Sequence, residues 1–110
     1  MRKLFFHESS VEQLSLESGR FICRLSGVAT GDGDLVAATI EVDGVSVMLV
    51  DGEEVSTPTC GPGDGEVLTL EFFDHGMKFI VEWERFSPRK AITHSYYVSG
   101  QRVAIQIGGC

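Results

Sequence analysis

Apolar residues recur along the chain in short runs with a two-residue period, and each run predicts a half-buried β-strand. The clearest run is MKFIVEWERF (77–86), in which one predicted face carries Met77, Phe79, Val81 and Trp83. Successive side chains of a strand point to opposite sides, so this period places one face on a core. Four further runs are interpreted as strands: RFICRLSGVA (20–29), EVLTLEFF (66–73), ITHSYYVS (92–99) and QRVAIQI (101–107).

The segment SSVEQLSLE (9–17) fits two structures. Ser9 or Ser10 could cap a short helix with Glu12 in its first turn. The same residues could form another strand, and the pattern does not separate the two.

Asp-Gly steps predict tight turns in the middle of the chain. Two β-rich runs separated by Asp-Gly are a strong hairpin signal, because a type I′ turn needs positive φ at both central residues. Asp43-Gly44 and Asp51-Gly52 both have such flanks. We therefore expect a three-strand meander of residues 35–42, 45–50 and 53–57.

The strand count and the spacing of the turns together predict the fold class. Seven or eight short strands, with turn signals every eight to twelve residues, are typical of all-β domains. The expected fold is an antiparallel all-β sandwich or small barrel. The 110 residues fit a single domain, 1–110, with residues 108–110 as a mobile tail.

Charge is distributed unevenly and suggests a kind of partner. The formal net charge is −7, and between Arg24 and Lys78 the chain has eleven acids and no Lys or Arg. Such a field speeds encounter with basic proteins and disfavours nucleic acid. We predict a non-enzymatic binding protein with a basic protein partner; the alternative is that the acids only confer solubility. The predicted partner-binding residues are Asp32, Asp34, Glu53, Glu54, Asp64 and Glu66.

Two Gly-rich loops carry paired acids and allow a second function. If the loops TGDGDL and GPGDGEV met, their four carboxylates could share a cation, and the protein would be a small-ligand or cation-binding β barrel. Neither loop has the ligand spacing of a calcium-binding helix–loop–helix motif. The favoured interpretation is that the acids are solvated turn residues, with no cofactor.

Signals for catalysis are weak, and an enzyme is the third reading. His94 shares a predicted strand face with Tyr96 and is expected to be packed, and Cys60 lies in a loop. An enzyme would need one of these two side chains in a cleft beside a second polar group. Cys23 is expected to be a buried thiol, although a disulfide with Cys60 is an alternative.

The start of the chain and its aromatic residues add smaller expectations. The apolar run in MRKLFF is too short for a signal peptide, so we expect a cytoplasmic protein without membrane contact. Phe73 and Tyr97 lie off the predicted core faces, where they would either bind a partner beside Arg89 and Lys90 or cover a second sheet. A homodimer through an exposed sheet edge is also compatible with a small β domain.

The region from Asp64 to Ile107 also carries a resemblance. DGEVLTLEFFDHGMKFIVEWERFSPRK, followed by YYVSGQRVAIQI, resembles small bacterial all-β proteins of unknown biochemistry. Some of these proteins are thought to act as immunity partners in polymorphic toxin systems. The resemblance implies an inhibitor that blocks a basic toxin, and it assigns no individual functional residue.

Overall fold

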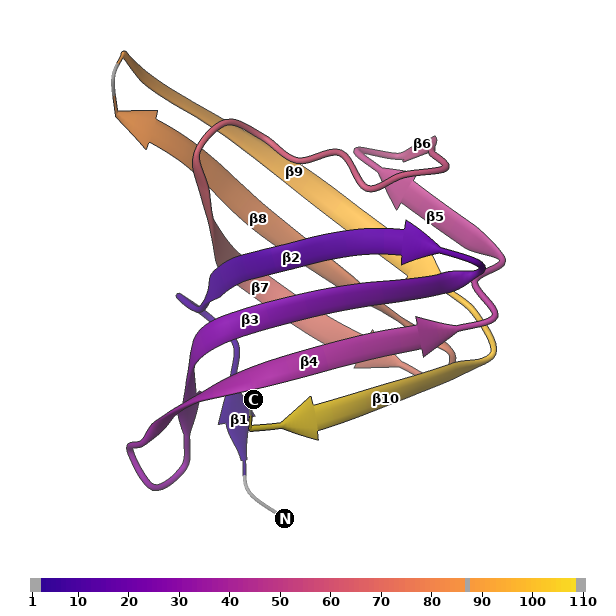
Figure 1. The fold of residues 1–110 in the computed structure, drawn as a ribbon, viewed down its shortest axis with the longest axis horizontal. Helices are drawn as coiled ribbons and strands as arrows, with labels where there is room; N and C mark the ends of the chain where they lie inside the picture. Colours follow the sequence, from indigo (N-terminus) through magenta and orange to yellow (C-terminus); the bar gives the residue numbers. More distant parts are fainter. Residues whose placement is uncertain (1–2, 87, 109–110) are drawn as a thin grey trace.

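Strands in two facing layers make up the fold (Figure 1). The computed structural model describes residues 3–86 and 88–108. These residues form ten β-strands and no helix. The strands are β1 (Leu4–Phe5), β2 (Ser10–Glu17), β3 (Arg20–Thr30), β4 (Leu35–Asp43), β5 (Val47–Val50), β6 (Glu53–Glu54), β7 (Asp64–Phe73), β8 (Gly76–Phe86), β9 (Arg89–Ser99) and β10 (Arg102–Ile107).

The strand order shows that the fold is an open sandwich. The near layer in Figure 1 has the order β10-β4-β3-β2, and the far layer has the order β7-β8-β9-β5-β6. The layers are joined where β2 pairs with β7, at Ser10↔Glu66 and Val11↔Gly65, and hydrogen bonds between Val67 and residues 8 and 9 extend this junction. All pairs are antiparallel, and β10 and β6 end the order without pairing to each other. The predicted antiparallel all-β class is therefore confirmed, in its sandwich form.

The core lies between the two layers and is built from the inward faces of five long strands together with β5. Alternation in β8 is as predicted, because Met77, Phe79, Val81 and Trp83 are buried while the intervening side chains face outward. The remaining buried hydrophobic residues are Phe21, Cys23, Leu25, Val28, Ala38, Ile40, Val42, Met48, Val50, Val67, Tyr96 and Val98. Burial of such a side chain contributes about 1.5–3 kcal/mol.

Residues 10–17 form strand β2, so the helical alternative for this segment is wrong. A β-bulge between Val11 and Gln13 shifts the alternation by one residue. Val11, Leu14 and Leu16 consequently all pack against the core. This bulge interrupts the two-residue period, so the sequence pattern alone did not separate a strand from a short helix.

The predicted three-strand meander is also wrong, because β4 and β5 belong to different layers. β4 pairs with β3 and β10, whereas β5 pairs with β9 and β6. At Asp43-Gly44 only Gly44 has positive φ (62°), so no type I′ turn forms there. The chain instead crosses between the layers, guided by a 2.8 Å hydrogen bond from the Ser46 N–H to the Ser99 carbonyl.

The second Asp-Gly step behaves as predicted. Asp51 and Gly52 have φ values of 55° and 85°, and they connect β5 to β6 as a tight hairpin. The two Asp-Gly steps differ in the segment that follows each. After Asp51-Gly52 the chain pairs antiparallel with β5 as β6, whereas after Asp43-Gly44 residues 45–46 leave β4 and bond to the other layer.

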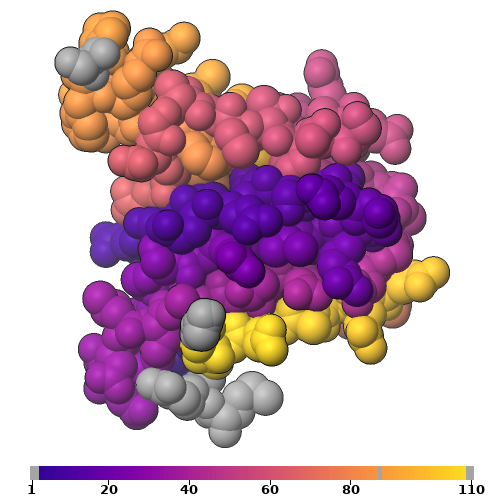
Figure 2. All heavy atoms as spheres, viewed as in Figure 1, coloured from indigo at the N-terminus to yellow at the C-terminus, as the bar shows by residue number. Residues whose placement is uncertain are grey.

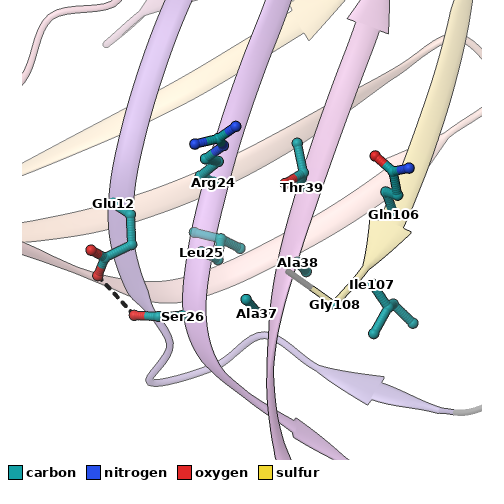
Figure 3. Close-up of a pocket in the computed structure, with 10 residues that line it drawn as sticks. All are labelled: Glu12, Arg24, Leu25, Ser26, Ala37, Ala38, Thr39, Gln106, Ile107 and Gly108. Carbon is teal, nitrogen blue, oxygen red and sulfur yellow. Dashed lines mark hydrogen bonds between the residues drawn. The ribbon is translucent and has the colours of Figure 1, made fainter. Parts of the chain in front are cut away.

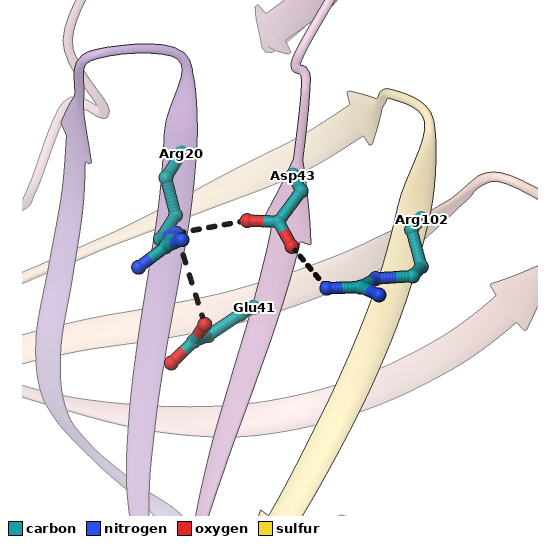
Figure 4. Close-up of polar contacts among 4 residues, drawn as sticks. All are labelled: Arg20, Glu41, Asp43 and Arg102. Atoms are coloured by element: carbon teal, nitrogen blue, oxygen red, sulfur yellow. Dashed lines mark hydrogen bonds and ion pairs between the residues drawn. The ribbon is translucent and has the colours of Figure 1, made fainter.

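A cluster of charged side chains surrounds Asp43, the last residue of β4 (Figure 4). The Arg20 Nε donates to Asp43 Oδ1 at 2.8 Å and lies 3.8 Å from Glu41, while Arg102 Nη2 donates to Asp43 Oδ2 at 3.1 Å. Hydrogen bonds from Arg20 and then Arg102 lower the pKa of Asp43. Asp43 therefore ties β3, β4 and β10 together and does not form a hairpin corner.

Of the predicted tail, residues 108–110, the structure describes only Gly108. Gly108 donates its N–H to the Ala37 carbonyl at 2.9 Å and so continues the pairing of β10 with β4. Residues 109 and 110, including Cys110, lie outside the described residues.

Candidate functional site

The six acidic residues predicted to bind a partner occupy three separate places (Figure 1). One pair lies in the hairpin between β3 and β4, a second forms β6, and the third begins β7; the β3–β4 hairpin and β6 lie at opposite ends of the view. These pairs are, in the same order, Asp32 and Asp34, Glu53 and Glu54, and Asp64 and Glu66. The six carboxylates therefore do not make one continuous patch.

The shared cation site does not form in the described part of the chain. Among those residues, no group of three His, Cys, Asp or Glu side chains is placed to hold a metal ion. The N–H groups of Asp32 and Asp34 donate to Thr30 Oγ1 at 3.3 and 3.2 Å, which organises their loop as a turn.

Asp64 and Glu66 have two acidic neighbours on β8 that the sequence did not predict. Across the β7–β8 ladder, Asp64 lies opposite Glu84 and Glu66 lies opposite Glu82. The residues between them, Gly65 and Trp83, are buried, so all four carboxylates project from the outer face of the far layer. We call these four residues the acidic face.

Like charges directly opposite one another are unfavourable, and little in the described structure neutralises them. Arg89 donates to Glu84 through Nη2 at 2.9 Å. Within residues 3–86 and 88–108, the other three carboxylates of the acidic face make no ion pair. The acidic face therefore carries uncompensated negative charge.

A bulge and a glycine build this face. A register shift between Val67 and Thr69 changes which residues of β7 and β8 meet. Gly65 lies against the ring of Trp83, where an added Cβ would come within 2.7 Å of the ring carbons. The glycines of CGPGDGE thus serve a close approach to Trp83 as well as a turn.

Two aromatic side chains hold the loop that leads into β7 through hydrogen bonds. Trp83 Nε1 donates to the Tyr96 hydroxyl at 2.9 Å, and that hydroxyl donates to the Thr59 carbonyl at 2.5 Å. Burial raises the pKa of Tyr96, so the hydroxyl keeps its proton for this contact. The network holds Thr59, in the middle of the loop of residues 55–63, against β8 and β9.

His94 has a partner that the sequence reading did not identify. Its Nδ1 lies 2.6 Å from Asp51 Oδ2, and Asp51 Oδ1 accepts the Ser95 N–H at 2.8 Å. The Ser95 N–H, and then His94, lower the pKa of Asp51. The sequence predicted Asp51 only as a turn residue. Its contact with His94 could not be predicted, because the two residues are 43 positions apart in the sequence and no local pattern links them.

Cys60 lies apart from His94. It lines a hollow of about 490 Å³ together with residues of β2, Gly65 and Trp83. Cys60 is an exposed residue, but partial desolvation raises the pKa of its thiol, which disfavours the reactive thiolate. Cys23 is buried as predicted, with its pKa raised to about 12, and both thiols are free. Among the described contacts no hydrogen bond joins Cys60 to His94.

A shallow groove crosses the outer face of the near layer (Figure 3). It has a volume of about 770 Å³ and runs over β2, β3, β4 and β10. Ser26, in the bulge of β3, donates to Glu12 at 2.8 Å along one side. The groove is open to solvent on the outer surface of the near layer.

The aromatic residues divide between core and surface. Trp83, Phe79 and Tyr96 are core residues, whereas Phe73 and Tyr97 stack on the outer face with ring centroids 5.3 Å apart. The β8–β9 hairpin projects beyond the rest of the molecule (Figures 1 and 2). Phe86, the last residue of β8, is 73% exposed.

Comparisons with known proteins add no functional information. No protein-family model, curated protein or solved structure matches the chain. None of the described residues belongs to a helix long and apolar enough to cross a membrane.

Proposed function

We propose that the protein is a non-enzymatic binding protein that engages a basic protein partner through the acidic face. An immunity-type inhibitor of a basic toxin is one form of this function, and it is the form that the resemblance in residues 64–107 implies. The role of the four carboxylates is charge complementarity to Lys or Arg of the partner.

The observation that carries the proposal is the direct opposition of like charges on β7 and β8. Asp64↔Glu84 and Glu66↔Glu82 stand on the same outer face, separated by a single buried pair. Arg89 relieves part of the repulsion at Glu84, but Glu66↔Glu82 has no such cation among the described residues and lowers the stability of the isolated sheet. A partner's cations would turn that repulsion into attraction. Solubility needs only dispersed charge and gives no reason for this arrangement.

The test uses two variants with the same change of charge. Asp64→Lys/Glu66→Lys reverses half of the acidic face, and Glu53→Lys/Glu54→Lys reverses the exposed acids of β6. Each double variant replaces two acids by two bases. Wild type and both variants are used to capture proteins from cell lysate, and a purified captured protein then gives association rates at several salt concentrations.

A basic protein should bind wild type and the β6 variant, and lose association rate at the acidic face variant by about tenfold or more. The rate should also fall as salt is added, because salt screens exposed charges. Equal binding by both variants, or no basic protein retained by wild type, would contradict the proposal. Melting temperatures of the variants check that both are folded.

A further inference from the structure

The near layer ends in a strand whose outer edge is unpaired among the described residues. β10 pairs with β4 on one side, and it is the last strand in the order. Gly108 donates its N–H to Ala37 in the register of this ladder. Main-chain groups alternate sides along a strand, so the N–H and C=O groups of Val103, Ile105 and Ile107 point away from β4.

The same three residues also form an apolar row. They lie opposite Val42, Ile40 and Ala38, which are buried, so their side chains share the inward face. The far layer does not cover the end of this row: Ile105 is 43% exposed and Ile107 is 41% exposed. An edge that offers free main-chain groups beside exposed isoleucines favours addition of another strand.

The opposite end of the strand order is protected in the usual way. β6 has only two residues, and both are exposed glutamates. A short, charged edge resists strand addition. β10 is longer, with six residues, and its one charged residue is Arg102, which is engaged with Asp43.

We propose that a second copy of this chain adds its β10 antiparallel to β10, with Ile105 of the two copies opposite each other. In this register Val103 faces Ile107 of the second copy, and Ile107 faces Val103. All three outward-pointing residues then form hydrogen-bonded pairs, each pair exchanging two main-chain hydrogen bonds. The apolar row continues across the two-fold axis, and the near layers merge into one sheet.

The charges along β10 also permit a second copy at this edge. The register places Ala104 opposite Gln106 and Arg102 opposite Gly108, so no like charges face each other. The chain as a whole has a net charge of −7, which opposes self-association through its acidic surfaces. β10 is an edge where two copies meet without opposing carboxylates.

The proposal is tested first by mass in solution. Wild type should have twice the 12.0 kDa chain mass in light scattering at high protein concentration and should dissociate on dilution. Ile105→Pro removes an N–H that points away from β4, so the monomer keeps its ladder while the dimer loses pairing. This variant should stay at the monomer mass over the same range.

Two lysine variants separate loss of the dimer from a general effect of adding a charged residue. Ile105→Lys should abolish the dimer, whereas Leu35→Lys, at a residue that is 70% exposed at the start of β4, should retain it. A wild type that is monomeric throughout would overturn the proposal. A dimer that persists in both Ile105 variants would also overturn it.

Cross-linking tests the register. In a background with Cys60 and Cys110 replaced by Ser, Ile105→Cys should form an interchain disulfide, because opposite residues in a hydrogen-bonded pair have Cα atoms about 5.5 Å apart. Val103→Cys should not, because the two copies of residue 103 lie about four residues apart along the paired strands. Cross-linking at residue 103 and not at residue 105 would exclude this register.

Discussion

Asp51 illustrates how one residue can satisfy a local and a distant requirement together. Its φ of 55° forms the turn between β5 and β6. Its carboxylate bonds to His94 and to the Ser95 N–H, and its own N–H donates to the Ser95 carbonyl at 2.8 Å. The turn is thereby held against β9, and not only closed on itself.

Replacing Asp51 by Asn should remove an acid-sensitive part of the stability. The pKa of Asp51 is lowered by the Ser95 N–H and by His94, so the native state favours the ionised form. This stabilisation is complete above the ordinary Asp pKa of about 3.9 and is lost as pH falls through the lower native pKa. Asp51→Asn should therefore be less stable than wild type at pH 7, by about 1 kcal/mol or less because the site is half exposed.

Urea unfolding of both proteins at neutral pH and at several values below pH 4 measures this difference. It should narrow as the pH falls, since wild type loses the contribution that the variant already lacks. Asp74→Asn, in the exposed turn after β7, serves as the control and should show no such narrowing. A difference that stays constant over the whole range would exclude ionised Asp51 as its source.

At the scale of elements, the Trp83–Tyr96–Thr59 network joins two strands to a loop. β8 and β9 supply the two aromatic side chains, and the loop supplies a carbonyl. The sequence pattern predicted a core position for both aromatics but contained nothing about Thr59. A hydroxyl at the end of a buried ring is what allows an apolar strand face to hold an irregular segment.

Tyr96→Phe should loosen this loop. The substitution leaves the buried Trp83 Nε1–H without its acceptor, which costs about 1–3 kcal/mol. It also releases the Thr59 carbonyl, so the thiol of the neighbouring Cys60 should react faster with an aromatic disulfide reagent. Both effects are measured with Cys110 replaced by Ser, by denaturant unfolding and by the rate of thiol modification.

Tyr97→Phe is the matched control for this experiment. Tyr97 lies on the outer face, stacked on Phe73, and its ring contact does not need the hydroxyl. The control should change neither stability nor the Cys60 rate appreciably. A Tyr96→Phe protein that is destabilised while its Cys60 rate is unchanged would contradict the anchoring of the loop.

The β7–β8 hairpin shows where prediction from the sequence stops. Its two strands and its turn follow from the apolar alternation and from Asp74-His75-Gly76. Counting back from the turn pair Phe73↔Gly76 without a bulge would place Glu66 opposite the buried Trp83. The bulge after Val67 moves Glu66 opposite Glu82, so the acidic face depends on a one-residue shift that the pattern does not reveal.

For the whole molecule, the excess of acid should make stability depend on salt. With a net charge of −7, screening of carboxylate repulsion should raise the melting temperature by a few °C, equivalent to about 1 kcal/mol or less. Calcium chloride at the same ionic strength should give the same shift as sodium chloride, because the described residues assemble no metal ligand set.

Thermal unfolding in both salts checks this expectation. The Asp64→Lys/Glu66→Lys variant is the control and should gain less from sodium chloride than wild type, because part of the repulsion is already removed. A rise specific to calcium would show a cation site and would revive the small-ligand alternative.

Local periodicity was sufficient for the class of this fold. An alternation of apolar and polar residues depends on the strand's own geometry, so the strands other than β1 and β2, the antiparallel class and the Asp51-Gly52 turn could be predicted without knowing what packs against them. Uneven charge was equally visible, because it is a property of the chain.

Pairing between distant segments required the folded molecule. Whether Asp43-Gly44 turns back or crosses over depends on which layer accepts β5, and the long strand that accepts it, β9, lies about 50 residues further along the chain. The same holds for the six predicted acids, which neighbouring strands distribute to three places, and for Glu82 and Glu84, which a bulge aligns with two of them. A single inserted residue reverses the face of every side chain beyond it, and its position is set by packing between strands, not by composition.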